Sequence, residues 1–149
     1  MNALELIDYF RTYCQENKMF FAPGESHFQN FISDQNVYDA FEMILCCDFR
    51  MSPVFNENQV EYVTYTGTLA VGRKREECTE SSLDELFLQK YDNRLSDLTK
   101  ILLSIIEGLV CQDEVDVDRC SIGYALNQYD VNIDFVTAQL TIRIPYVAE

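Results

Sequence analysis

The densest group of candidate metal ligands is an acidic cluster formed by Asp113, Glu114, Asp116 and Asp118. Carboxylates are calcium ligands, but an EF-hand loop needs oxygen ligands at alternate positions followed by glycine. Here Asp116 and Asp118 are followed by Cys120 and then Ser121, so the pattern fails. The cluster therefore predicts a solvated acidic loop and no metal site.

A catalytic centre based on histidine would depend on His27, because it is the only histidine. It lies beside Phe28 in a connecting segment and has no suitably spaced partner. The chain also has no phosphate loop, dinucleotide fingerprint or nucleophile elbow. We expect no catalytic residue, no cofactor and no enzyme activity, with an acid–base pair of scattered Asp and Glu residues as the remaining enzymatic alternative.

Cysteine thiols are the third candidate group. The six cysteines stand in apolar patterns without paired spacing, at positions 14, 46, 47, 78, 111 and 120, and no Cys-x-x-Cys occurs. Zinc sites and disulfide frameworks use regular paired spacings. We therefore expect buried, reduced thiols.

The charge balance limits the possible partners. The chain has 25 acidic and 11 basic residues and a net charge of −14, which disfavours both nucleic-acid binding and anionic membranes. Its only basic cluster, Arg73, Lys74 and Arg75, is followed at once by Glu76 and Glu77. We interpret this cluster as a solvated turn, with a local phosphate or partner contact as the alternative.

Length and composition predict a single folded domain over residues 1–149. A chain of this size buries roughly 70% of the surface that its unfolded form exposes. Hydrophobic residues make up 48% of it, well above disordered composition. No signal peptide and no run of about 20 apolar residues is present, so we expect a soluble, cytosolic protein.

Two segments have helical periodicity. The first runs from about residue 2 to 16. The second covers 82–110 and has one apolar stripe, made by Tyr91, Leu95, Leu98, Leu102, Ile105 and Leu109. Ser82 and Glu85 match a capping box at its start, Gly108 predicts its end, and a kink is expected around residues 91–93.

The remaining segments indicate strands. Alternation predicts strands at about 40–51, 59–71 and 133–146 and a further strand that begins near Ile122, with turns at 52–58 and 127–132. Gly67 predicts a bulge or a close backbone approach. The aromatic-rich segment 18–35 is expected to be either a cover over the core or a contact surface. The order α-ββ-α-ββ indicates an α+β fold, an antiparallel sheet of about four strands with two helices on one face.

This order of elements resembles the phage tail terminator and tail-completion family, also called head-tail joining proteins. The resemblance covers about residues 2–146 and is most suggestive at Gly67-Thr68-Leu69-Ala70-Val71-Gly72-Arg73-Lys74 and at Asn127-Gln128-Tyr129-Asp130-Val131-Asn132. The long segment 18–35 departs from the compact family pattern.

The resemblance implies a structural virion protein, made in the bacterial host cytoplasm. Family members form a homo-oligomeric ring, often a hexamer, that caps the tail tube and joins it to the head connector. Their expected partners are the protein itself, the tail tube and head-completion proteins; DNA only passes through, and no membrane is involved. An alternative from the charge is an acidic interaction or inhibitor protein, a phosphate mimic or an immunity-type protein, that binds a basic partner.

Overall fold

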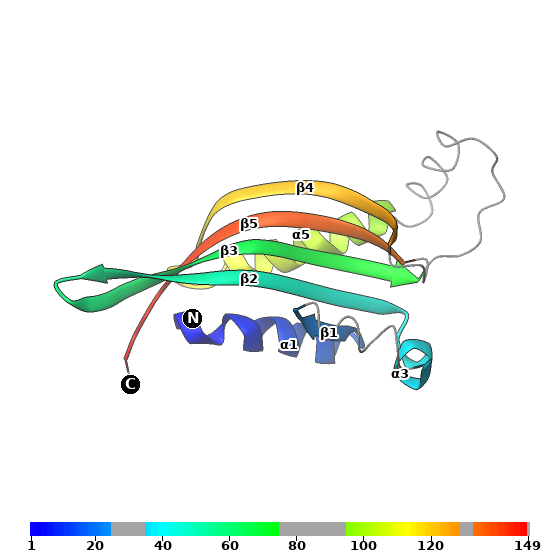
Figure 1. The fold of residues 1–149 in the computed structure, drawn as a ribbon, viewed down its shortest axis with the longest axis horizontal. Coiled ribbons are helices and arrows are strands. Elements are labelled where there is room, and N and C mark those ends of the chain that lie inside the picture. Colours follow the sequence, from blue (N-terminus) through cyan, green and yellow to red (C-terminus); the bar gives the residue numbers. More distant parts are fainter. Residues whose placement is uncertain (25–34, 75–94, 129–132, 149) are drawn as a thin grey trace.

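A computed structural model describes residues 1–24, 35–74, 95–128 and 133–148. Figure 1 shows a curved sheet with its longest hairpin projecting at one end. The helical elements are η1 (Ala3–Glu5), α1 (Leu6–Glu16), α3 (Gln35–Ala40) and α5 (Ser96–Val110). The strands are β1 (Phe20–Pro23), β2 (Met43–Asn56), β3 (Gln59–Lys74), β4 (Asp116–Gln128) and β5 (Ile133–Pro145).

The sheet has five strands in the order β1-β2-β3-β5-β4 and is antiparallel except for the parallel pair β1 and β2. The α+β class is therefore right, whereas the predicted four strands and the order α-ββ-α-ββ are wrong. The additional elements are β1 and the short helix α3, both inside or beside the segment 18–35. Sequence periodicity missed β1 because four residues are too few to establish an alternation.

One face of the sheet is covered by α1 and α5, which share a single hydrophobic core with it. The predicted stripe of α5 is confirmed from Leu95 onward, because Leu95, Leu98, Leu102, Ile105 and Leu109 are all buried. From α1, Leu6, Phe10 and Cys14 are buried against the same core. Tyr91, the capping box at Ser82 and Glu85, and the expected kink lie outside the described residues.

The helix α5 ends at Val110, as the predicted range 82–110 has it, and Gly108 therefore lies inside its last turn and does not terminate the helix. Its glycine has a packing role instead. The Tyr9 hydroxyl donates a hydrogen bond to the Ile105 carbonyl oxygen (3.3 Å), and a Cβ added at Gly108 would lie 2.6 Å from that hydroxyl. The missing side chain therefore lets α1 approach α5.

The β2–β3 hairpin is longer than the sequence predicted. The expected turn at 52–58 is confirmed only at its end, at Glu57 and Asn58, because β2 continues to Asn56, with Pro53 paired opposite Val63. Proline is tolerated at this position because β1 pairs only with Ile44–Cys47, so β2 is an edge strand beyond that point. The close approach predicted at Gly67 is confirmed, since an added Cβ would collide with the Asp48 carbonyl oxygen.

Among the residues that the structure describes, cover over the opposite face of the sheet is confined to one end. There, Ala22, Ile44, Ala70, Ile133 and Phe135 form a second, smaller core. Gly72 belongs to this packing, because the Phe135 ring occupies the space where its Cβ would be.

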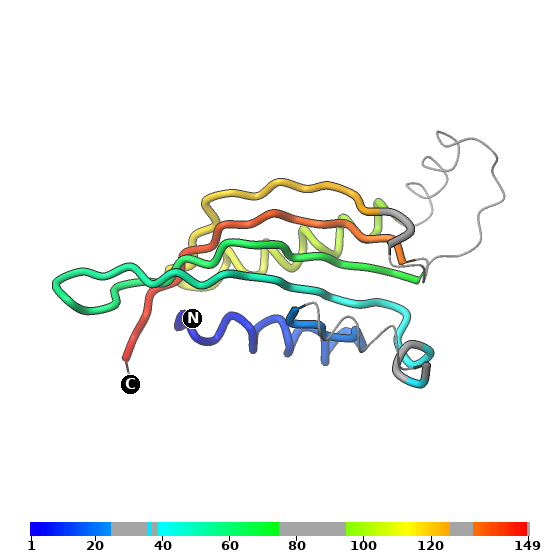
Figure 2. Tube along the Cα trace, viewed as in Figure 1, coloured from blue at the N-terminus to red at the C-terminus, as the bar shows by residue number. Residues whose placement is uncertain are grey.

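The two chain ends meet near the root of the hairpin (Figure 2). The Asn2 side chain donates to the Val147 carbonyl oxygen (2.9 Å), and the Val147 amide donates to the Asn2 side-chain oxygen (3.4 Å). The buried Tyr65 hydroxyl donates to the Ala3 carbonyl oxygen (2.8 Å). The Tyr65 bond attaches η1 to β3, the central strand of the sheet, and the Asn2–Val147 bonds join the two chain ends.

Candidate functional site

The end of the β2–β3 hairpin extends beyond its neighbour β5 (Figure 1). The β3–β5 ladder ends at Tyr62 opposite Pro145, whereas β2 and β3 stay paired as far as Asn56 opposite Gln59. The last contact with the C-terminal segment is the Tyr146 amide, which donates to the Glu61 carbonyl oxygen (3.0 Å). Residues 55–60 therefore form a projecting two-stranded arm.

A two-residue turn closes this arm. Glu57 and Asn58 have φ values of 51° and 68°, and positive φ at both central residues is the signature of a type I′ turn. Asparagine suits this conformation, but a glutamate there costs roughly 1–2 kcal/mol because its Cβ approaches the carbonyl oxygen. The turn thus holds a strained acidic residue at its end, and strained residues are often functional.

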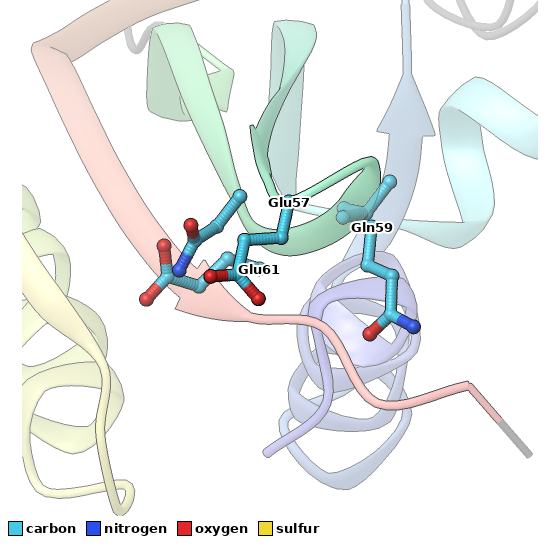
Figure 3. A pocket seen from close by; sticks show the side chains of 5 residues that line it. Glu57, Gln59 and Glu61 are labelled. Atoms are coloured by element: carbon cyan, nitrogen blue, oxygen red, sulfur yellow. The ribbon is translucent and has the colours of Figure 1, made fainter.

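A shallow hollow of about 250 Å³ lies beside the turn, lined by Asn56, Glu57, Gln59, Val60 and Glu61. Figure 3 shows the labelled side chains Glu57, Gln59 and Glu61 around it. Small-molecule sites are usually larger, roughly 300–1,000 Å³, and mostly apolar. The hollow is therefore better described as part of an exposed acidic tip, by which we mean Asn56 to Glu61.

The arm and the part of β2 that precedes it also expose apolar side chains. Phe55 is 64% exposed and Met51 is 51% exposed. Both are on the helix-covered side of the sheet, because their register partners Val60 and Tyr65 pack against the main core. No second strand pairs with β2 between Asp48 and Asn56, in the part of the chain that the structure describes. Exposed apolar groups beside an open edge are suited to pairing with another chain.

The uncovered part of the opposite face is polar and carries three arginines. Its side chains form three rows, each crossing β2, β3, β5 and β4 in register. We call this surface the arginine face. Its first row is Ser52, Thr64, Arg143 and Asp116, its second row is Arg50, Thr66, Thr141 and Arg119, and its third row is Asp48, Thr68, Gln139 and Ser121. None of these twelve residues is buried.

The arginine face is much less acidic than the whole chain. Its twelve residues include three arginines and two aspartates, and Asp118, which lies near enough to contribute to the raised pKa of Arg143, brings the local sum to zero, against −14 for the protein. Arg143 donates to the Asp116 carboxylate (3.1 Å) and lies over the Tyr62 ring, and the hydrogen bond to Asp116 is the main cause of its raised pKa. By contrast, Arg50 and Arg119 form no ion pair with any residue that the structure describes.

The acidic cluster is not the loop that the sequence predicted. Asp113 and Glu114 are in the turn after α5, but Asp116 and Asp118 belong to β4. Asp116 is held by Arg143. Across the described ranges, no three His, Cys, Asp or Glu side chains are grouped as metal ligands would be.

The thiols divide into two classes. Cys14 and Cys47 are buried and Cys46 is partly buried, as expected, and desolvation raises the pKa of each thiol to about 12. The prediction of burial is wrong for Cys111 and Cys120, which are exposed. Cys111 follows the last turn of α5, and Cys120 lies on the edge strand β4. All five of these cysteines are free.

The structure describes only part of the basic cluster and does not describe His27. The basic cluster is not a turn at its start, because Arg73 and Lys74 are the last residues of β3. Arg73 forms an ion pair with Glu42 (2.8 Å). His27, Cys78 and Arg75 lie outside the described residues.

No protein-family model, curated protein or solved structure matches this chain. Among the described residues, no helix has the length and apolar character needed to cross a membrane.

Sequence reasoning found the hairpin but missed the arginine face. Thr64, Thr66 and Thr68 alternate visibly along one strand. Arg50, Arg119 and Arg143, however, come from three different strands, and only the register places them in adjacent rows.

Proposed function

We propose that the protein is a structural subunit of a phage or prophage tail. It assembles into a homo-oligomeric ring that caps the tail tube and joins it to the head connector. The observation that carries this proposal is the projecting β2–β3 arm, which exposes Phe55 and an open strand edge to another chain. The order of helices and strands supports the tail-protein part of the proposal only through the family resemblance.

The energetics of the arm favour assembly. Burying a phenylalanine side chain contributes about 1.5–3 kcal/mol, and Phe55 is mostly exposed in the isolated chain. In the proposed ring, the arm contacts a different surface on the next copy, so the interface is heterologous and repeats around an axis. Such a repeat forms a ring when the rotation closes.

The acidic charge suits a ring through which DNA passes. Carboxylates that face a lumen repel phosphates, so the genome moves through without binding. We expect the lumen of the assembled ring to be acidic. A basic or apolar lumen would contradict this part of the proposal.

The rival proposal, an acidic inhibitor that mimics DNA phosphates, needs carboxylates arrayed on one exposed face. The described exposed acidic residues are instead distributed over several elements, including Asp8 on α1, Glu57 at the hairpin tip, Glu107 on α5 and Asp118 on β4. This distribution favours the ring.

Immunogold labelling tests the tail assignment directly. Particles induced from the strain that carries the gene would be labelled with an antibody against this chain and viewed by electron microscopy. We expect gold at the head-proximal end of the tails, with unlabelled particles from a deletion strain as the control. Tails that are complete but carry no label at that end would refute the assignment.

A further inference from the structure

We propose that the acidic tip of one copy docks on the arginine face of the next copy. This inference rests on the proposed homo-oligomeric ring and identifies the two surfaces that form its repeating interface. The tip contributes Glu57 and Glu61, and the face contributes Arg50 and Arg119.

Charge complementarity favours this pairing. The net charge of −14 would keep copies of this chain apart unless a region of opposite sign met an acidic one. On the described sheet, the arginine face gathers three arginines, and Arg50 and Arg119 have no ion-pair partner among the described residues. The tip supplies carboxylates on a projecting turn. Complementary charge at such an interface fixes orientation and accelerates association.

The dimensions of the two surfaces also agree. Neighbouring strands lie about 4.8 Å apart, so a row of four residues spans roughly 14 Å, and three rows on one face span a similar length along the strands. A two-stranded tip with its side chains is narrower than this. Threonine and serine hydroxyls in the rows can donate to the carbonyl oxygens of the turn and accept from its amides.

The tip has to come from another molecule. Arg50 lies within β2 and Glu57 directly follows its last residue, so the strand carries the tip away from the face at about 3.4 Å per residue. The hairpin is paired along its whole length, so it does not fold back onto its own sheet. When the tip of one copy docks on one neighbour and its own face receives the tip of another neighbour, the contact is heterologous, which is the geometry that builds rings.

Charge reversal tests the pairing. A tip variant carries Glu57→Arg with Glu61→Arg, and a face variant carries Arg50→Glu with Arg119→Glu. Their matched controls reverse exposed charges of the same sign elsewhere, as Glu16→Arg with Glu107→Arg and as Lys18→Glu with Lys100→Glu. Circular dichroism and thermal unfolding establish that each variant is folded. Sedimentation velocity then measures assembly of each full-length protein over a concentration series.

We expect each reversal variant to assemble about a hundredfold less tightly than wild type, because like charges then face each other. An equimolar mixture of the two variants should assemble again, since the reversed tip fits the reversed face and the unchanged tip fits the unchanged face. The controls should assemble as wild type does.

Three outcomes would overturn this pairing, and they separate it from the proposed function. If wild type assembles and the reversal variants do so equally well, the ring stands and this interface is wrong. The same conclusion follows if the variants fail separately and their mixture also fails. If wild type is monomeric throughout the series, both the ring and the pairing are wrong.

Discussion

The contact between Tyr9 and Gly108 predicts that Gly108→Ala changes the stability of the fold in opposite directions, depending on which residue is at position 9. In an ordinary helix, Gly→Ala stabilises by roughly 0.8–1 kcal/mol because it lowers the backbone entropy lost on folding. Here the new Cβ would lie 2.6 Å from the Tyr9 hydroxyl oxygen but 3.9 Å from the ring carbon Cζ that carries it. Removing that hydroxyl should therefore remove the conflict.

The magnitudes follow from these distances. In wild type, Gly108→Ala displaces the hydroxyl and its hydrogen bond to Ile105, which costs about 1 kcal/mol, and adds overpacking strain of about 1–3 kcal/mol. After the propensity gain, we expect a net loss of about 1–3 kcal/mol. In a Tyr9→Phe background the same change should instead stabilise by about 0.5–1 kcal/mol, so the coupling is about 2 kcal/mol.

Urea unfolding at one fixed protein concentration, with reductant present, measures all four proteins of this cycle. A constant concentration is needed because assembly stabilises the folded state. For a chain of this length, each kcal/mol corresponds to roughly 2–4 °C in Tm, so thermal unfolding provides a second reading. If Gly108→Ala has the same sign in both backgrounds, the packing argument is wrong.

The remaining predictions concern the turn, the thiols and the second core. Replacing Glu57 and Asn58 by Asn and Gly should stabilise the fold by about 1 kcal/mol in urea unfolding, because this pair suits a type I′ turn; unchanged or lower stability would contradict the positive φ values. Iodoacetamide at pH 8 should alkylate Cys111 and Cys120 well before Cys14, Cys46 and Cys47, and peptide mass spectrometry would expose the reverse order. Burial raises the pKa of the thiols of Cys14, Cys46 and Cys47 from an ordinary 9.0 to about 12, so the unfolded chain loses these protons first as the pH rises. Their contribution to the unfolding free energy is therefore full below pH 9 and should fall as the pH rises towards 12. An unfolding free energy that stays constant over that window would be inconsistent with burial. Gly72→Ala should cost about 1–3 kcal/mol because its Cβ overlaps the Phe135 ring, and an effect within about 0.5 kcal/mol of zero would disprove that contact.

Periodicity predicted the parts of the fold that are long and amphipathic. The stripe on α5 and the strand β5 could be read from the sequence because burial on one side of a long element leaves a repeated apolar pattern. The short strand β1 left no such pattern. The extension of β2 through Pro53 was missed because proline in a strand is acceptable only where the edge is open, and openness is a property of the whole sheet.

The candidate interface depends still more on tertiary structure. Gly108 looked like a helix terminator, but its role depends on Tyr9, which is far away in the sequence. Arg50, Thr66, Thr141 and Arg119 form one row only because four strands pair in a particular register. Composition could therefore indicate an acidic interaction protein, but it could not show where positive charge collects.

The mass of the assembled wild-type protein tests ring formation most directly. Native mass spectrometry over a concentration series would give the number of copies in each species. The ring proposal predicts one closed oligomer of fixed copy number that does not grow further as the concentration rises. A monomer at every concentration, or a continuous ladder of growing polymers, would contradict it.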